Sequence, residues 1–309
     1  MNKSKYILSC DWGTSSFRLR LVDIEKMKVL HEISTNEGVN AIHNEWIAIR
    51  KPENVRANFY RSFIQSNVEK MPVAIVKDVR VIISGMASST IGMKELSYAN
   101  APFNLSGENL ITDHFVADEF CKHPILLVSG LQTKNDVMRG EETILIGCDL
   151  SDEETLVIFP GTHSKHVVVK NKIAVDFKTY ITGEFFDLLS TKSLLAKSVV
   201  KNVMSDNKSF IEGVKDGAKN NVLNASFHVR TNQLFKKYSA EENYHHLSGL
   251  LIGNEVSAIC CQSVIIVADD VLMDLYTSAL STINPNIKIH QQNANEALIK
   301  AHVCIYNNK

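Results

Sequence analysis

The chain has 309 residues, of which 45% are hydrophobic and 22% are charged. This composition is typical of a globular protein with room for two domains, and it excludes disordered and fibrous proteins. The 33 Lys and Arg residues nearly balance the 34 Asp and Glu residues, which leaves a formal net charge of -1. Because no overall charge attracts polyanions, neither nucleic acid nor a membrane surface is expected as a partner.

The apolar stretches of the chain are short. The run after the first lysines covers only Tyr6 to Leu8, which is too short for a signal peptide. Other runs, such as Ile125 to Val128, fall far below the ~20 residues that a membrane-spanning helix requires. We therefore expect a cytoplasmic protein. Its six cysteines are scattered and form no CxxC motif, so they are interpreted as reduced thiols.

The first half of the chain alternates strand and helix signals. Tyr6–Cys10 is apolar and Phe17–Asp23 alternates, so together they predict a β-hairpin with a polar tip. The other predicted elements of this half are a strand at 29–34, an amphipathic helix at 55–69, and buried strands at 79–84 and 124–129.

Helical periodicity begins at Arg139, with acidic residues in the first turn, where the helix dipole favours them. Strand signals return at Thr155–Phe159, and a small-residue segment again separates this strand from a hairpin. The remaining predicted elements are strands at 166–170, 172–176 and 263–267, an edge strand at 287–290, and helices at 183–195, 209–223, 227–235, 243–262, 271–280 and 294–303.

The second half of the chain opens as the first half does. When Gly13 is placed on Gly161, Gly13-Thr-Ser-Ser aligns with Gly161-Thr-His-Ser, and the strands after both tips coincide. Either two unrelated hairpins match by chance or two α/β domains arose by duplication, and we favour the duplication. No Pro/Ser-rich linker divides the chain, so we expect a hinge between an N-terminal lobe of residues 1–139 and a C-terminal lobe of residues 140–309.

Both hairpin tips present backbone N–H groups and hydroxyls, which are the donors that a phosphate chain requires. The sequence has no GxxxxGK[ST] motif and no GxGxxG motif after a strand. Asp11 ends the strand before the first tip, where a carboxylate either holds Mg²⁺ against phosphate oxygens or caps a turn. In the second tip, His163 is interpreted as a phosphate or substrate donor, and Lys165 as a phosphate or carboxylate contact.

The segment Asp136-Val-Met-Arg-Gly-Glu-Glu-Thr gathers three carboxylates and one guanidinium at the start of an apolar helix. A charged run of this kind is often a solvated face. Here the apolar body of the helix must be buried, which draws its first turn inward. A carboxylate in that turn is placed to accept the proton of an attacking hydroxyl, and Arg139 to anchor an anionic substrate.

Two further segments each allow a structural and a functional interpretation. Gly85-Met-Ala-Ser-Ser follows a buried strand, where the hydroxyls of Ser88 and Ser89 either bind a polyol or belong to an ordinary turn. Gly249 and Gly253 are spaced either for close helix packing or for the approach of a nucleotide.

Together these motifs resemble the 2-dehydro-3-deoxygalactonokinase family, sugar-acid kinases of the acetate kinase, sugar kinase, heat-shock seventy and actin superfamily. The resemblance covers nearly the whole chain. The motifs that carry it are Asp11-Trp-Gly-Thr-Ser-Ser-Phe-Arg, Gly85-Met-Ala-Ser-Ser, Asp136-Val-Met-Arg-Gly-Glu-Glu-Thr, Pro160-Gly-Thr-His-Ser-Lys, Thr182-Gly-Glu and Ser248-Gly-Leu-Leu-Ile-Gly-Asn-Glu. The third and fourth of these together are specific to the family.

The resemblance implies an α/β fold of two actin-like (ribonuclease H-like) lobes with a central cleft, in which duplicated mixed sheets are flanked by helices. It also implies a reaction. The γ-phosphoryl group of ATP moves to the 6-hydroxyl of 2-dehydro-3-deoxy-D-galactonate in galactonate breakdown, with Mg²⁺ on the phosphates. The binding partner is then a small sugar acid. The oligomeric state, including a homo-oligomer, stays open.

Site residues follow from the resemblance position by position. Glu141 takes the place of the catalytic base, with Asp136 as the second candidate, and Asp11 is the metal ligand. The phosphate and nucleotide contacts are Gly13, Thr14, Ser15, Gly161, Thr162, His163, Gly249 and Gly253, and the substrate contacts are Ser88, Ser89, Arg139 and Lys165. The chain departs from the family at Ala268, where a glycine near the adenosine is expected.

Two alternative functions stay open. A kinase for another sugar acid or polyol keeps every loop and changes only the substrate pocket. An actin-like ATP-binding protein shares the fold and hydrolyses ATP without a small acceptor, and fold alone does not separate it from a kinase.

Overall fold

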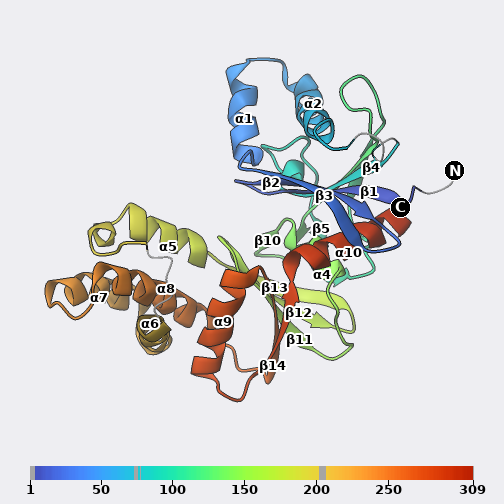
Figure 1. Cartoon of the computed structure of the whole chain (residues 1–309). Coiled ribbons are helices and arrows are strands. Elements are labelled where there is room, and N and C mark those ends of the chain that lie inside the picture. The colour runs from blue at the N-terminus through green and yellow to red at the C-terminus, as the bar shows by residue number, and fades with distance from the viewer. Residues whose placement is uncertain (1–3, 73–75, 77, 202–206, 309) are drawn as a thin grey trace. The chain divides into compact units, whose positions relative to one another are not determined.

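The computed structural model describes residues 4–72, 76, 78–201 and 207–308 of the chain. The chain forms two compact units (Figure 1). Unit 1 contains the chain up to Asp152, residues 171–176 and the C-terminal segment from Ala294, and unit 2 contains residues 153–170 and 177–293. Among the described residues, no helix combines the length and apolar character needed to cross a membrane.

Unit 1 is built on a six-stranded mixed sheet with the order β3-β2-β1-β4-β8-β7. Its strands are β1 (Tyr6–Trp12), β2 (Phe17–Asp23), β3 (Lys28–Thr35), β4 (Arg80–Gly85), β7 (Thr112–Phe115) and β8 (Ile125–Val128). β1 pairs antiparallel with β2 and parallel with β4. The central strands are buried almost without interruption because helices cover both faces of the sheet.

Alternate residues of β1 face different helices, because successive side chains of a strand point to opposite faces. Leu8, Cys10 and Trp12 belong to a core shared with α1 (Val39–Ala48) and α2 (Arg56–Val68). On the other face, Ser9 contacts the C-terminal helix α10 (Ala294–Asn308), which Figure 1 shows beside β1.

A buried histidine attaches α10 to the centre of this sheet. His302 Nδ1 lies 2.7 Å from Ser9 Oγ on β1, and its Nε2 lies 3.1 Å from Ser84 Oγ on β4. Burial, followed by the charge of Arg20, lowers the pKa of His302 to about 3, so the ring is neutral at pH 7. The C-terminal helix is therefore part of the first unit.

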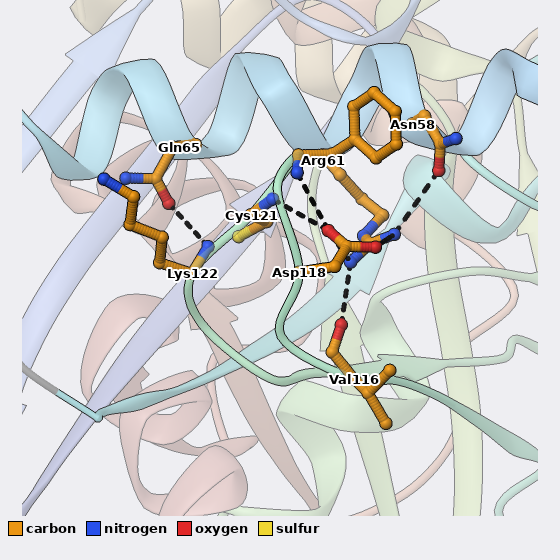
Figure 2. Close-up of polar contacts among 8 residues, drawn as sticks. Asn58, Arg61, Gln65, Val116, Asp118, Cys121 and Lys122 are labelled. Carbon is orange, nitrogen blue, oxygen red and sulfur yellow. Dashed lines mark hydrogen bonds and ion pairs between the residues drawn. The ribbon is translucent and has the colours of Figure 1, made fainter.

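The segment between β7 and β8 is held against α2 by a buried arginine (Figure 2). Arg61 donates from Nη1 to Asp118 Oδ2 at 2.8 Å and from Nη2 to the Val116 carbonyl at 2.7 Å. One turn further along α2, Gln65 Oε1 accepts a hydrogen bond from Lys122 N at 2.9 Å. These charge-assisted and backbone contacts fix an otherwise exposed segment.

Shorter elements complete unit 1. They are η1 (Glu53–Val55), η2 (Met86–Ser88), β5 (Ala99–Asn100), β6 (Phe103–Asn104), β9 (Leu131–Gln132), β10 (Val137–Met138) and α4 (Glu141–Ile146). β10, β9 and β5 form a small sheet, and the β9–β10 hairpin leads directly into α4.

Unit 2 is built on a second mixed sheet with the order β15-β14-β11-β12-β13, and the first residues of β13 pair with β6 of unit 1. The strands are β11 (Thr155–Phe159), β12 (Ser164–Lys170), β13 (Ile173–Tyr180), β14 (Ser263–Ala268) and β15 (Lys288–Asn293). The helices are α5 (Thr182–Thr191), η3 (Leu194–Lys197), α6 (Asn207–Lys219), α7 (Val222–Leu234), α8 (Ala240–Val256) and α9 (Asp270–Ile283).

The two sheets repeat one topology. Reading from the third strand of each opening meander, the orders are β3-β2-β1-β4-β8 and β13-β12-β11-β14-β15. In each sheet the first strand pairs antiparallel with the second and parallel with the next central strand. This is the ribonuclease H-like arrangement, so the predicted α/β fold with duplicated mixed sheets flanked by helices is confirmed. The central cleft stays a prediction.

The units divide the chain differently from the predicted lobes of residues 1–139 and 140–309. α4 remains in unit 1 because it packs on α10, where a Cβ at Gly147 would lie 1.8 Å from the Ala297 carbonyl oxygen. The chain passes from unit 1 to unit 2 after Asp152, returns to unit 1 for residues 171–176, and returns again at Ala294, where α10 begins. The sequence analysis also did not predict α1, the helix that follows Gly38.

Candidate active site

The first hairpin tip is a tight turn whose hydroxyl groups face solvent. Gly13 N donates to the Ser16 carbonyl at 2.9 Å, which closes the turn between β1 and β2. Thr14 and Ser15 are exposed, whereas Trp12 and Phe17 on either side are buried. The buried aromatic residues anchor a tip whose polar groups stay accessible to an anion.

This tip rests on the start of α1. Val39 N donates to the Gly13 carbonyl at 2.9 Å, and Asn40 N donates to the Thr14 carbonyl at 3.2 Å. A Cβ at Gly38 would lie 2.4 Å from the Thr14 oxygen, so only glycine permits this approach. The backbone of the first loop is thereby fixed in place.

The second hairpin tip, residues 160–163, rests on the start of α5 in the same way. Glu184 N donates to the Thr162 carbonyl at 3.0 Å, and a Cβ at Gly183 would lie 2.5 Å from the Gly161 oxygen. Thr162 and His163 are exposed, and His163 Nε2 lies 2.6 Å from Glu184 Oε2. Each unit therefore carries a loop of small polar residues, braced by a helix start and a glycine.

Asp11 lies at the carboxyl end of β1, opposite Ser84 of β4 in the parallel register. Its carboxylate is half-buried, and Arg18 Nη1 lies 3.9 Å from Asp11 Oδ2. Mg²⁺ in phosphoryl-transfer sites is held by one or two carboxylates together with substrate phosphates, so a single half-buried carboxylate beside this polar loop fits that ion. Among the described residues, no group of three or more metal-ligating side chains is present.

Two glycines bring α4 to the carboxyl ends of β1 and β4. Gly85 has φ +91°, and a Cβ there would lie 2.7 Å from the Trp12 carbonyl oxygen. Gly140 has φ +113°, and a Cβ on it would lie 3.5 Å from Gly85 Cα. The acidic first turn of α4 therefore lies at the same edge of the sheet as Asp11.

Arg139 connects this turn with the serines that follow β4. Its Nη1 donates to Ser88 Oγ at 2.6 Å, and its Cζ lies 4.2 Å from the centre of the Tyr98 ring. Ser89 is 6% exposed, and neither Ser89 Oγ nor Arg139 Nε has a hydrogen-bond partner among the described residues. The guanidinium of Arg139 thus lies between the Ser88 hydroxyl and the face of the Tyr98 ring.

Glu141 and Glu142 occupy the first turn of α4 in different surroundings. Glu141 is half-buried, and its Oε2 accepts from Arg139 N at 3.1 Å. Glu142 is fully buried, and it accepts from Gly140 N at 2.7 Å and from Thr143 Oγ1 at 2.8 Å. Burial and the charge of Glu141 raise the pKa of Glu142 to about 7.

The sequence analysis missed Glu142 as a site residue. The helical spacing could have predicted its burial. Glu142 lies three positions before Leu145 and four before Ile146, so it shares the apolar face of the helix. Asp136, the second candidate base, lies in the turn of the β9–β10 hairpin, where its Oδ1 accepts from Val137 N at 2.9 Å. The structure thus groups Glu141 with Arg139 and Ser88, and places Asp136 at the other end of β10.

A cavity of about 520 Å³ in unit 2 adjoins the second loop. Gly161 and Thr182 line it together with the polar residues Lys201, His245 and Ser248, and Phe186, Leu272 and Tyr276 belong to its mainly apolar wall. Its size and lining are those of a small-molecule site. Apart from its chain neighbours, no described residue has an atom within 4 Å of the position that a Cβ on Gly161 would take, so the loop backbone is open on that side.

Lys165 and the two α8 glycines make contacts within unit 2 that support its structure. Lys165 is 4% exposed and donates from Nζ to the His163 carbonyl at 2.7 Å, so it braces the second loop. A Cβ at Gly249 would lie 2.0 Å from the Phe210 oxygen, and one at Gly253 2.3 Å from the Val214 oxygen. Both glycines therefore serve close packing of α8 against α6, which is one of the two alternatives given above. We include neither glycine in the nucleotide site proposed below.

The two units repeat a ribonuclease H-like fold, and each carries a braced polar loop at its first hairpin. A family model described as 2-keto-3-deoxy-galactonokinase matches residues 11–301. The chain belongs to this family, whose members are phosphotransferases with an alcohol group as acceptor, and the resemblance seen in the sequence is confirmed.

Individual relatives agree with the family match. A Rhizobium meliloti protein named as a 2-dehydro-3-deoxygalactonokinase is 30% identical, and the alignment covers 93% of both chains. The 2-dehydro-3-deoxygalactonokinase of Escherichia coli is 31% identical over 83% of this chain and 80% of the relative. A crystal structure from Sinorhizobium meliloti is titled as a 2-dehydro-3-deoxygalactonokinase and is 28% identical to this chain. The two structures superpose with a TM-score of 0.83 over 98% of this chain and 96% of the Sinorhizobium chain.

Proposed function

We propose that this protein transfers the γ-phosphoryl group of ATP to the 6-hydroxyl of 2-dehydro-3-deoxy-D-galactonate in galactonate breakdown. The observation that carries the proposal is the convergence of Arg139 and Ser88 beside the acidic turn of α4, in a chain of this kinase family. The names of the relatives in R. meliloti and E. coli support the choice of sugar acid. The cytoplasm is the proposed location, and a homo-oligomer stays a prediction.

Phosphate binding is assigned to the two loops. The backbone N–H groups and hydroxyls of Thr14, Ser15 and Thr162 donate to phosphate oxygens, and the imidazole of His163 adds an N–H donor. Asp11 is the residue that would hold Mg²⁺, which neutralises charge on the phosphates when it is bound. The apolar cavity beside Gly161 receives the nucleoside.

The acceptor site is assigned to unit 1. Arg139 binds the substrate carboxylate, while Ser88 and Ser89 bind its hydroxyls. Glu141, half-buried and next to Arg139, accepts the proton of the attacking hydroxyl as phosphoryl transfer proceeds. Lys165 was predicted as a phosphate or carboxylate contact. We assign it instead to support of the loop that carries His163, because its Nζ donates to the His163 carbonyl.

A coupled assay of ATP consumption tests the proposal. The acceptors are the 2-dehydro-3-deoxy acids derived from galactonate and from gluconate, together with polyols that lack a carboxylate. We expect turnover with the galactonate-derived acid to exceed turnover with its epimer and with the polyols. ATP hydrolysis that is independent of every acceptor would contradict the proposal and favour an actin-like ATP-binding protein.

A further inference from the structure

A buried carboxylate lies behind the second phosphate loop and takes no part in the mechanism above. Glu255 is the last residue of the Ser248–Glu255 motif, lies near the end of α8, and is 4% exposed. Its Oε1 accepts from Ser164 Oγ at 2.7 Å and from His166 Nε2 at 2.9 Å. Its Oε2 accepts from the Tyr276 hydroxyl at 2.7 Å.

The partners of Glu255 come from the elements that surround the loop. Ser164 directly follows His163, the last residue of the loop, and begins β12. Thr182, which also donates a hydrogen bond to Glu255, begins α5, the helix on which the loop rests. Tyr276 belongs to α9 and lines the cavity next to the loop. One carboxylate therefore joins the loop, its supporting helix and the cavity wall.

The surroundings of Glu255 favour the ionised form despite its burial. Burial by itself raises the pKa of Glu255, but the hydrogen bond and charge of His166, with further bonds from Thr182 and Ser164, lower it below its usual value. A buried carboxylate that loses these partners is strongly unfavourable, so the network holds its members in one arrangement.

We propose that Glu255 is a positioning residue of the nucleotide site: it holds the loop of residues 160–163 in register with the cavity wall and so sets the affinity for the nucleotide without touching it. This inference rests on the proposed function, because it takes the loop and the cavity to bind ATP. No reacting atom contacts Glu255, so its effect is expected in nucleotide binding and not in the binding of the sugar acid.

The test is Glu255→Gln, which preserves shape but removes the charge. ADP binding is measured by calorimetry, and KM for ATP and for the sugar acid are measured in the coupled assay. We expect the Kd for ADP and the KM for ATP to rise about tenfold, as loss of charge-assisted hydrogen bonds predicts, with KM for the sugar acid unchanged.

Asp216→Asn is the matched control. Asp216 lies on α6, and its Oδ2 lies 3.1 Å from Nε2 of the buried His246 on α8. Like Glu255→Gln, this change therefore removes the charge of a carboxylate paired with a buried histidine, but at the contact between α6 and α8. We expect it to lower the unfolding temperature without changing the Kd for ADP. An unchanged Kd for ADP in Glu255→Gln would overturn the inference.

Tyr276→Phe keeps the proposal testable if Glu255→Gln does not fold. It removes only the hydrogen bond to Oε2 and leaves the aromatic ring in the cavity wall. We expect a smaller rise in the Kd for ADP than in Glu255→Gln. Where both variants fold, the rise in the double variant should differ from the sum of the two single effects, in free energy, because both changes remove the same hydrogen bond. Wild-type affinity in Tyr276→Phe would overturn the inference. If the wild type binds ADP but phosphorylates no sugar acid, the proposed function fails alone, and the ADP measurements still decide the role of Glu255.

Discussion

Arg139 and Ser88 are joined by a 2.6 Å hydrogen bond between the guanidinium Nη1 and the serine Oγ, although 51 positions separate them in the chain. The bond connects η2, which follows β4, with a residue two positions before the start of α4. The same guanidinium lies over the ring of Tyr98. A hydroxyl on one edge of the planar guanidinium and an aromatic ring on its face hold it in one orientation.

Arg139→Lys is expected to weaken acceptor binding. Lysine keeps the positive charge but loses the bidentate fork and the stacking on Tyr98. We expect KM for the sugar acid to rise about tenfold or more, with KM for ATP unchanged, as measured by steady-state kinetics with each substrate varied. Arg80→Lys, at the other end of β4, is the control and should leave both values unchanged. Equal KM values in wild type and Arg139→Lys would remove Arg139 from the acceptor site.

Glu141→Gln is expected to abolish most turnover. The amide cannot accept the proton of the attacking hydroxyl, so kcat should fall about 10²- to 10⁴-fold. Calorimetry should show ADP binding unchanged, because Glu141 has no assigned phosphate contact. Asp136→Asn is the matched comparison, and a larger loss of kcat in that variant would make Asp136 the base.

Glu142→Gln is expected to change how stability depends on pH. The pKa of this carboxyl is about 7 in the folded chain and 4.5 ordinarily, so the folded state binds the proton more tightly than the unfolded state. The contribution of this group to the free energy of unfolding is therefore fully present below pH 4.5 and is lost as the pH rises to 7. The loss is about 3 kcal/mol at most.

Urea unfolding at pH 4.5 and pH 8 measures this effect. The amide has no charge to bury, and it is able to accept from Gly140 N while donating to Thr143 Oγ1. Relative to wild type, we expect Glu142→Gln to gain stability at pH 8 and to gain little at pH 4.5. A difference that does not depend on pH would show that the pKa of Glu142 is the same in the folded and unfolded states, which contradicts the prediction.

Gly38→Ala is expected to displace the first phosphate loop. The added Cβ would lie 2.4 Å from the Thr14 oxygen, which the backbone must relieve by moving. We expect KM for ATP to rise at least about tenfold, because a displacement near 1 Å is enough for losses of this size. Gly183→Ala should do the same to the second loop, where the Cβ would lie 2.5 Å from the Gly161 oxygen.

Gly217→Ala separates this effect from general destabilisation. Its Cβ would lie 1.9 Å from the Leu250 oxygen, in the packing of α6 on α8 and away from either loop. We expect a lower unfolding temperature, with KM for ATP unchanged in the fraction that stays folded. A rise in KM for ATP as large as that of Gly38→Ala would contradict the assignment of the loops to phosphate.

Local pattern was sufficient to predict the elements that open each unit. Alternating apolar residues predicted the strands, and Gly13 and Gly161 with their small neighbours predicted the tips, because strand pairing across a short turn depends only on residues close in sequence. The resemblance to the kinase family also came from contiguous motifs, and the family match confirmed it. In the same way, acidic residues at the start of an apolar helix pointed to a carboxylate base, and the resemblance to the family selected Glu141.

Tertiary structure alone decided which distant residues support these motifs. The close approach of Gly38 to the first loop, the seating of His302 between Ser9 and Ser84, and the four partners of Glu255 join residues far apart in the chain. The raised pKa of Glu142 likewise depends on its burial at the carboxyl ends of β1 and β4. Sequence spacing predicts neighbours along one strand or helix, whereas burial and hydrogen bonding between elements are set by how the chain packs.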